Sequence, residues 1–312
     1  MREKLPDARQ LGILTSAQLE SDGATTWRSR KALVLAGAYE RAGPDLFVRP
    51  ETFDDPRLEW WRDALLLLMR TMPGSRFSRQ CAAALWGLDG FEPPVAISVD
   101  VDRHRRARMA NVHHPRTPRP AAWSAGLPVT DAVTTMVEMG AGLGPRNRWA
   151  GDLRPIVPID LVELAVESAL RLGLVDLIAL ADGASPAGWP PTLLAQVLDR
   201  RPLDAPPTES YLETRAVQLF REGNLPDPER QVVIRDERGQ FVARVDFRFG
   251  VTVVECDGRE HHAREGSFER DRERWDRLQA LGLRPMVFTY DHIERKRRRT
   301  LDLLGQTMSL AA

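Results

Sequence analysis

Three acidic residues interrupt or end apolar stretches near the end of the chain. Asp246 lies within the stretch 241–249, and Glu255 and Asp257 end the stretch 251–257. The second stretch is apolar on both faces at first, which predicts a central buried strand. Alternation along that strand places Glu255 and Asp257 on one face, about 6.6 Å apart along its axis.

These carboxylates predict a metal site. Converging carboxylates in a partly dry site repel one another unless a cation lies between them. Mg²⁺ or Mn²⁺ is the usual cation, because hard ions prefer carboxylate oxygens. We therefore expect Asp246, Glu255 and Asp257 to bind Mg²⁺ or Mn²⁺, which could activate water and hold a scissile phosphate. The alternative is that Glu255 and Asp257 simply end a strand in solvent.

Secondary-structure elements in the order α, β, β, β, α, β, α must position these residues. An amphipathic helix begins at Ser210 and ends before Gly223, and a charged helix capped by Ser267 ends before Gly282. The remaining expected elements are strands over 231–235, 241–249, 251–257 and 285–290, and a final helix over 293–304. We predict one α/β domain with a central mixed sheet over 205–312.

The ordered motifs of this domain resemble the PD-(D/E)XK nuclease superfamily, and more closely the domains related to very-short-patch-repair endonucleases. The resemblance covers about residues 208–305. The matching positions are Ser210, Glu213, Arg215, Gln231, Val245, Asp246, Phe247, Val254, Glu255, Asp257, Gly258, His261, Phe268, Asp271, Gly282, Phe288 and Thr289.

The resemblance implies a role for each matching acidic residue and for two histidines. Asp246 and Glu255 would bind the metal with Asp257 beside them, and Glu213 on the first helix would complete the acidic cluster. His261 or His262 would act as a general acid or base or orient the water. The wider superfamily has a lysine where this chain has Asp257. The repair-endonuclease branch also lacks that lysine and relies on histidine.

Basic residues near these motifs are candidates for phosphate contact. Arg270 and Arg274 lie one helical turn apart, although the alternating charges around them are typical of a solvated helix face. The run 295–299 is almost unopposed by acidic residues, so we expect Arg295, Lys296 and Arg297 to contact DNA phosphates.

The first fifty residues predict a winged helix-turn-helix. A short helix begins near Thr15 and ends at Gly23, a second begins at Trp27 and ends at Gly37, and a hairpin turns at 43–44. The second helix would offer a set of polar and basic residues to a DNA groove. That set comprises Thr25, Thr26, Arg28, Ser29 and Lys31. Many such helix pairs bind nothing, so a purely structural role stays open.

The region 51–204 predicts a mixed α/β domain with a helical second half. With the first fifty residues it resembles the actinobacterial type of abortive-infection (AbiEi-like) antitoxin and regulator proteins. The matching stretches are 12–18, 43–48, 78–88 and 126–135. The resemblance implies a DNA-binding winged helix and a middle domain with a protein partner. One departure is Thr134-Thr135, where we expect an Arg-Thr pair.

Composition limits the remaining possibilities. The 312 residues carry 44 basic and 44 acidic side chains, so bulk attraction to nucleic acid is absent and anion binding must come from local patches. Two cysteines exclude a disulfide framework. No apolar run approaches the roughly 20 residues of a membrane helix, and we expect a cytoplasmic protein without a membrane partner.

Taken together, the sequence predicts an α+β multidomain protein divided at 1–50, 51–204 and 205–312. Its leading predicted function is a metal-dependent DNA endonuclease or nickase, in DNA repair or phage defence, with DNA bound by the winged helix. The alternative is a DNA-binding regulator or antitoxin-like protein whose nuclease fold is inactive.

Overall fold

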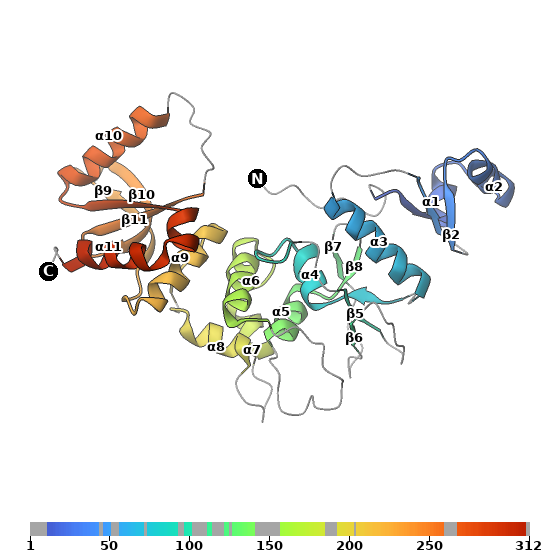
Figure 1. Ribbon diagram of the computed structural model, residues 1–312, viewed down its shortest axis with the longest axis horizontal. Coiled ribbons are helices and arrows are strands. Elements are labelled where there is room, and N and C mark those ends of the chain that lie inside the picture. Colours follow the sequence, from blue (N-terminus) through green and yellow to red (C-terminus); the bar gives the residue numbers. More distant parts are fainter. Residues whose placement is uncertain are drawn as a thin grey trace. The chain divides into compact units, whose positions relative to one another are not determined.

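The computed structural model describes most of the chain as α+β structure with several mixed sheets (Figure 1). The described residues are 11–43, 46–50, 56–71, 74–92, 97–101, 111–113, 122–124, 127–140, 157–184, 192–202, 204–258 and 267–309. Two compact units share these residues: the first comprises 1–165 and 174–196, and the second 166–173 and 197–312. No helix in these ranges is long and apolar enough to cross a membrane.

The first unit begins with two short helices and a three-stranded sheet. Its elements are β1 (Ile13–Thr15), α1 (Ser16–Ser21), α2 (Trp27–Leu35), β2 (Glu40–Gly43) and β3 (Leu46–Val48), with antiparallel strand order β1-β3-β2. Thr15 and Thr26 cap the two helices through capping boxes, which satisfy backbone N–H groups at each helix start. The predicted helices and hairpin are confirmed as elements, whereas β1 was not predicted.

The rest of the first unit combines a five-stranded mixed sheet with helices. Its strands, in the order β6-β5-β4-β8-β7, are β4 (Arg76–Phe77), β5 (Ser98–Asp100), β6 (Asn111–His113), β7 (Ala122–Ser124) and β8 (Leu127–Val129). Its helices are α3 (Pro56–Thr71), α4 (Arg79–Leu85), α5 (Ala132–Gly140) and α7 (Leu177–Ala184), whereas α6 (Ile159–Arg171) and α8 (Leu193–Arg200) each continue into the second unit. A Cβ on Gly140 would lie 2.4 Å from the Cβ of Leu194, so only glycine permits this approach of α5 and α8.

The second unit has the predicted order of elements around a four-stranded sheet. The sheet order is β12-β11-β10-β9, with β11 and β12 parallel and the other pairs antiparallel. Its elements are α9 (Tyr211–Glu222), β9 (Glu229–Arg235), β10 (Phe241–Phe249), β11 (Thr252–Asp257), α10 (Ser267–Ala280), β12 (Arg284–Thr289), η2 (Asp291–Arg295) and α11 (Arg297–Ser309). The prediction of one final helix over 293–304 was wrong in one respect, because a π-helical turn, η2, precedes α11.

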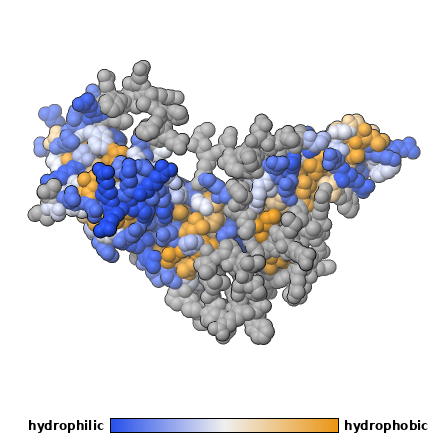
Figure 2. Space-filling model, viewed as in Figure 1, coloured by the Kyte–Doolittle hydropathy of each residue, from blue (hydrophilic) through white to orange (hydrophobic). Residues whose placement is uncertain are grey.

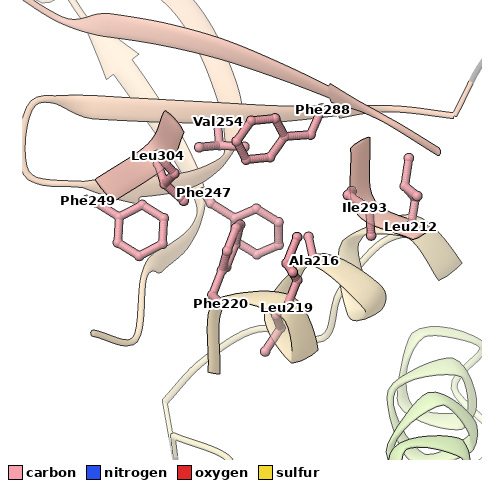
Figure 3. Close-up of a cluster of buried hydrophobic side chains, with 11 residues drawn as sticks. Leu212, Ala216, Leu219, Phe220, Phe247, Phe249, Val254, Phe288, Ile293 and Leu304 are labelled. Carbon is pink, nitrogen blue, oxygen red and sulfur yellow. The ribbon is translucent and has the colours of Figure 1, made fainter. Parts of the chain in front are cut away.

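Helices cover both faces of this sheet. On one face, α9 and α11 pack against the strands through aromatic and aliphatic side chains that include Phe220, Phe247 and Phe288 (Figure 3). The rings of Phe220 and Phe247 meet edge to face with their centroids 5.3 Å apart, a favourable arrangement for two aromatic rings. On the other face, Leu278 of α10 packs with Val253 and neighbouring strand residues. The unit is therefore a three-layer α/β/α structure (Figure 1).

A buried ion cluster fastens the end of α6 to the second unit. Glu167 accepts hydrogen bonds from Arg201 (3.2 Å), from Arg230 of β9 (3.0 Å) and from the backbone N–H of Thr208 (3.1 Å). All three charged side chains are almost completely buried. Residues 166–173 and 197–204 group with the C-terminal unit, which extends beyond the predicted start at 205. The predicted division at residue 50 stays a prediction.

We expect Glu167→Gln to lower the free energy of unfolding by about 3–5 kcal/mol, because the change leaves two buried guanidinium groups without their carboxylate. Urea unfolding of the full chain, followed by circular dichroism, measures the loss. The matched control is Glu229→Gln, since Glu229 faces Arg248 across 4.0 Å at an exposed site. The control should lose less than about 1 kcal/mol, and equal losses in both variants would show that the cluster adds nothing.

Candidate functional site

Two of the predicted acidic residues, Glu213 and Asp246, line one cavity of about 350 Å³ in the second unit. The other lining residues are Ser210, Tyr211, Leu212, Cys256, Gly258 and Tyr290. They come from the start of α9, from β10 and the end of β11, and from the position after β12. Since β11 and β12 are parallel, their carboxyl ends meet at one edge of the sheet, and the cavity lies at that edge.

Glu213 is fixed by the way α9 begins. Ser210 caps the helix, and its hydroxyl donates a hydrogen bond of 2.8 Å to Glu213 Oε1. Glu213 Oε2 accepts from the backbone N–H of Glu209 and from the side-chain amide of Gln231, both at 2.8 Å. A serine followed three residues later by glutamate is typical of a helix start. The carboxylate is therefore only 5% exposed and closely held.

Asp246 lies where the sheet departs from regular strand geometry. Val245 packs with the cluster beneath α10, whereas Phe247 packs beneath α9. Residues two apart in a regular strand share a face, so the strand is irregular between them. On the neighbouring strand β9, Gln231 has a backbone φ of +54°, which residues other than glycine rarely adopt. In this arrangement Asp246 Oδ2 accepts a 2.7 Å hydrogen bond from the backbone N–H of Cys256.

Burial raises the pKa of both carboxyl groups. For Glu213 the next raising influence is the negative charge of Asp246, and for Asp246 it is the charge of Glu209. Burial likewise raises the pKa of the Cys256 thiol, and the charges of Asp246, Glu213 and Glu255 raise it further. The two cavity acids thus lie close enough to repel each other in a poorly solvated place. A bound cation would relieve this repulsion.

The negative charge of Glu255 is already balanced by a cationic side chain. Its carboxylate forms an ion pair with the guanidinium of Arg274 from α10, and both side chains are largely shielded from solvent. Neither Glu255 nor Asp257 is among the cavity-lining residues. The structure thus brings Asp246 together with Glu213 in the cavity and pairs Glu255 with Arg274. The predicted convergence of Asp246, Glu255 and Asp257 on a metal stays a prediction.

The side chains present fit a divalent cation in part. Glu213 and Asp246 offer carboxylate oxygens, and the buried Oε1 of Gln231 accepts no hydrogen bond from any described residue. Carboxylate and amide oxygens are the protein ligands that Mg²⁺ prefers. Within the described ranges, however, no three His, Cys, Asp or Glu side chains form a group that could hold a metal. His261 and His262 lie outside the described residues.

The predicted phosphate-binding residues at the C-terminus fall into two groups. Arg295 and Lys296 are exposed and lie 3.7 Å and 2.5 Å from Asp291 oxygens, respectively. Arg297 instead donates hydrogen bonds to Glu222 of α9 and to the carbonyl of Ile293, so it fastens α11 to its neighbours. Arg274 is engaged with Glu255, as stated above. The side chain of Arg270 lies outside the described part of the chain.

The predicted recognition helix α2 is exposed along much of its length and buries no residue completely. Thr26 and Ser29 bond to each other in the capping box, with Thr26 Oγ1 accepting a 3.1 Å hydrogen bond from the Ser29 N–H. Thr25 and Arg28 are exposed, and Lys31 lies over the ring of Trp27, 5.1 Å from its centroid. Arg28 and Lys31 therefore remain accessible, whereas Thr26 and Ser29 have a structural task.

The sequence predicted no catalytic or metal-binding role for four polar residues that the structure places at the site, although it predicted a helix start at Ser210, and both Ser210 and Gln231 are among the matching motif positions. Gln231 bridges toward the acidic pair, Ser210 holds Glu213, and Tyr211 and Tyr290 line the cavity. The spacing of serine and glutamate at 210 and 213 could have predicted the two hydrogen bonds between Ser210 and Glu213 at the start of α9. The positive φ of Gln231 had no sequence signal, since glutamine is not typical of that conformation.

No protein-family model and no curated protein sequence matches the chain. Among solved structures, the RV2827C protein from Mycobacterium tuberculosis is similar over 64% of this chain and 80% of its own, with 18% sequence identity and a TM-score of 0.28.

The raised pKa of Glu213 predicts a pH-dependent stability. A carboxyl whose folded pKa lies above its unfolded value stabilises the fold at low pH, and this contribution is lost as pH rises through the folded pKa. Glu213→Gln removes that titration and keeps a donor for Ser210 and an acceptor for Gln231. We expect the melting temperature of the variant, relative to wild type, to rise steadily between pH 5 and pH 8, by a few degrees.

Differential scanning fluorimetry across this pH range measures the shift. The control is Glu229→Gln, which makes the same chemical change at an exposed position. A constant offset for Glu213→Gln would mean that Glu213 titrates alike in the folded and unfolded states.

Proposed function

We propose that the C-terminal unit is a Mg²⁺- or Mn²⁺-dependent DNA endonuclease or nickase with a PD-(D/E)XK-type domain related to very-short-patch-repair enzymes. The observation that carries this proposal is the pair of buried carboxylates, Glu213 and Asp246, in one cavity at the carboxyl ends of two parallel strands. Two like charges held together without solvent favour binding of a hard cation. The resemblance of the motifs over 208–305 supplies the reaction class.

In this proposal Glu213, Asp246 and the amide oxygen of Gln231 hold the metal. Bound there, a divalent ion supplies Lewis acidity to a phosphate oxygen and lowers the pKa of water. The hydrogen bonds from Ser210 and from the backbone of Glu209 and Cys256 keep both carboxylates oriented. His261 or His262 would take or return the proton of the attacking water. Burial excludes bulk water around the acids and strengthens their interaction with a cation.

In this proposal Glu255 and Asp257 lie outside the cavity that holds the metal. Glu255 pairs with Arg274, so its charge is balanced from within the protein. It could reach a metal only by exchanging that guanidinium for the ion. Asp257 follows at the end of β11, near the cavity edge formed by Gly258. Both remain predicted metal ligands, now second to Glu213 and Asp246.

DNA binding in the proposal begins at α2. The N-terminal helices and hairpin would act as a winged helix-turn-helix, with Arg28 and Lys31 reaching phosphates from the exposed side of α2. The middle region would contact a protein partner, as the resemblance to AbiEi-like regulators implies. Trp123, 66% exposed on β7, is a large apolar side chain that such a partner could cover.

A second candidate function is a DNA-binding regulator whose nuclease fold does not cut. The Glu255–Arg274 ion pair favours it, because an arginine already neutralises one of the predicted metal ligands. In that case the acidic cavity would be a structural remnant. Binding of DNA without cleavage under any divalent metal would support this candidate over the nuclease.

We expect nicking of supercoiled plasmid to require Mg²⁺ or Mn²⁺ and to fall by at least about 100-fold in Asp246→Asn, since loss of a ligand exceeds the 10–100-fold cost of changing outer contacts. Glu255→Gln, which also removes a predicted ligand, should lose activity too but less than Asp246→Asn. Gel-based nicking assays with metal titration measure both.

Asp302→Asn is the matched control, because Asp302 is exposed on α11 and its replacement changes charge equally. It should cut as wild type does. Cleavage that persists in EDTA or in Asp246→Asn would contradict the metal site, provided circular dichroism shows that the variants are folded.

The double variant Arg28→Ala/Lys31→Ala should weaken duplex DNA binding and flatten its salt dependence. Each lost phosphate contact lowers the slope of log affinity against log salt by about 0.9, so the slope should change by about 1.8. Fluorescence anisotropy across a salt series measures it. Arg235→Ala/Arg238→Ala removes the same charge from an exposed hairpin and should leave the slope unchanged. Identical curves for wild type and the α2 variant would exclude α2 from DNA contact.

A further inference from the structure

Tyr290 is an exposed aromatic residue at the rim of the acidic cavity. It is 52% exposed, yet it lines the same cavity as Glu213 and Asp246. Such a ring presents an apolar surface to solvent next to charged groups. Aromatic side chains that serve only packing are largely covered, as Phe288 is two residues earlier on β12.

The backbone around Tyr290 is firmly held. Phe288 and Ile293 on either side are buried in the cluster that α9 and the sheet share (Figure 3). The Nδ1 atom of His292 lies 3.2 Å from the backbone nitrogen of Thr289 and 3.0 Å from its hydroxyl, which closes the turn between them. The ring therefore projects from a rigid base, and ordering it on a ligand has a small entropic cost.

The second tyrosine of the cavity has a different task. The hydroxyl of Tyr211 donates a 3.2 Å hydrogen bond to Glu294, and Arg215 donates to both oxygens of the same carboxylate at 2.6 Å and 2.9 Å. Burial, together with the charge of Glu294, raises the pKa of Tyr211 to about 12, so the hydroxyl stays protonated. Tyr211 is thus held in place by its hydrogen bond to Glu294, whereas the ring of Tyr290 is accessible to a ligand.

Exposed cations follow Tyr290 along the chain. Arg295 and Lys296 end η2, and Arg298 and Arg299 stand in the first turn of α11. Arg298 and Arg299 form no ion pair with any residue that the structure describes, whereas Arg297 is tied to Glu222. Figure 2 shows strongly hydrophilic residues gathered over this part of the molecule. Arg295 and Lys296 share the single carboxylate of Asp291, so positive charge exceeds negative charge there and can attract an anionic chain.

We infer that this rim binds an unpaired nucleotide beside the scissile phosphate, with its base stacked on Tyr290 and its backbone passing over Arg295, Lys296, Arg298 and Arg299. The inference rests on the proposed function and adds the substrate class, namely DNA with a single-stranded stretch at the cut. In a duplex both faces of each base are covered by neighbours. Exposing one for Tyr290 requires unstacking and unpairing, a cost that an already unpaired base avoids.

The binding experiment uses the full chain carrying Arg28→Ala/Lys31→Ala, which removes the proposed DNA contact of α2, in EDTA so that nothing is cut. A fluorescein-labelled 12-nucleotide single strand and the duplex of the same sequence are titrated by anisotropy. The single strand should bind more tightly. Tyr290→Ala should weaken single-strand binding by about 5- to 150-fold, the range of one stacked base, whereas Tyr290→Phe and Tyr290→Trp should stay within about threefold of the parent.

Phe241→Ala is the matched control, because Phe241 is 57% exposed on β10 and does not line the cavity. An abasic scan gives a second readout: removing one base of the oligonucleotide should weaken binding to the parent and have no further effect in Tyr290→Ala. If Tyr290 had only a structural role, Tyr290→Ala would weaken binding of the intact and all abasic oligonucleotides by the same factor. No single abasic position would then be without further effect in that variant, and Tyr290→Phe would not restore the parent affinity.

The basic residues have their own test. Arg298→Gln/Arg299→Gln should lower the slope of log affinity against log salt by about 1.4, at roughly 0.7 for each phosphate contact of a single strand. Arg235→Gln/Arg238→Gln changes the charge equally at the exposed hairpin and should leave the slope as it was.

Three results would overturn the inference: tighter binding of the duplex, equal losses in Tyr290→Ala and Phe241→Ala, or no measurable binding of the single strand. Failure of the nuclease itself gives a different pattern. If the single strand binds through Tyr290 but Mg²⁺ and Mn²⁺ produce no cleavage, the binding site stands and the proposed catalytic function falls.

Discussion

Holding two carboxylates together away from water is the constraint around which the C-terminal unit is arranged. Glu213 and Asp246 repel each other, and burial leaves little solvent to screen them. The protein offsets this cost with hydrogen bonds from the helix cap, from two backbone N–H groups and from Gln231. The four donors come from three segments: Glu209 and Ser210 at the start of α9, Gln231 on strand β9 and Cys256 near the end of β11. The meeting of these segments therefore serves the acidic pair as much as it serves the apolar core.

Strand β11 also carries Glu255, whose negative charge is balanced in a different way. Glu255 receives a guanidinium from α10, so on that side the cation is a side chain and belongs permanently to the fold. The Glu213–Asp246 pair has hydrogen-bond donors but no arginine or lysine bonded to it in the described residues. The positive charge of Arg244 lowers the pKa of Asp246, but less than burial raises it. An acid pair that no guanidinium or ammonium group in the described part of the chain contacts directly gains more from an external cation than Glu255, which already has Arg274.

Much of the second unit could be predicted because its signals are local. Alternating apolar residues, a serine cap at 210 and glycines after helices define α9, three strands and α10 without reference to distant contacts. The short strands β7 and β8 were missed, since three-residue strands hold no full period of a pattern. Helix α8 was missed as well, because its eight residues make little more than two helical turns and lie between proline-rich stretches. The convergence of Glu213 with Asp246 was implied by family resemblance, but its cause, a strand irregularity at Asp246 and a positive φ at Gln231, depends on tertiary packing that no local window contains.

Gln231 lies between two features of the second unit: its amide contacts Glu213 at the acidic cavity, and its chain neighbour Arg230 belongs to the buried ion cluster. A non-glycine residue with φ near +54° costs roughly 1–2 kcal/mol and persists only where its surroundings fix it. Its neighbour Arg230 is held by Glu167 of α6 in the buried ion cluster, and the side-chain amide of Gln231 itself is bonded to Glu213. The residue that orients Glu213 is therefore adjacent in the chain to one that a buried ion pair holds in place. A buried salt bridge is weak evidence for stability by itself, but an ion pair at Arg230 also limits how far β9 can move at the residue beside the acidic pair.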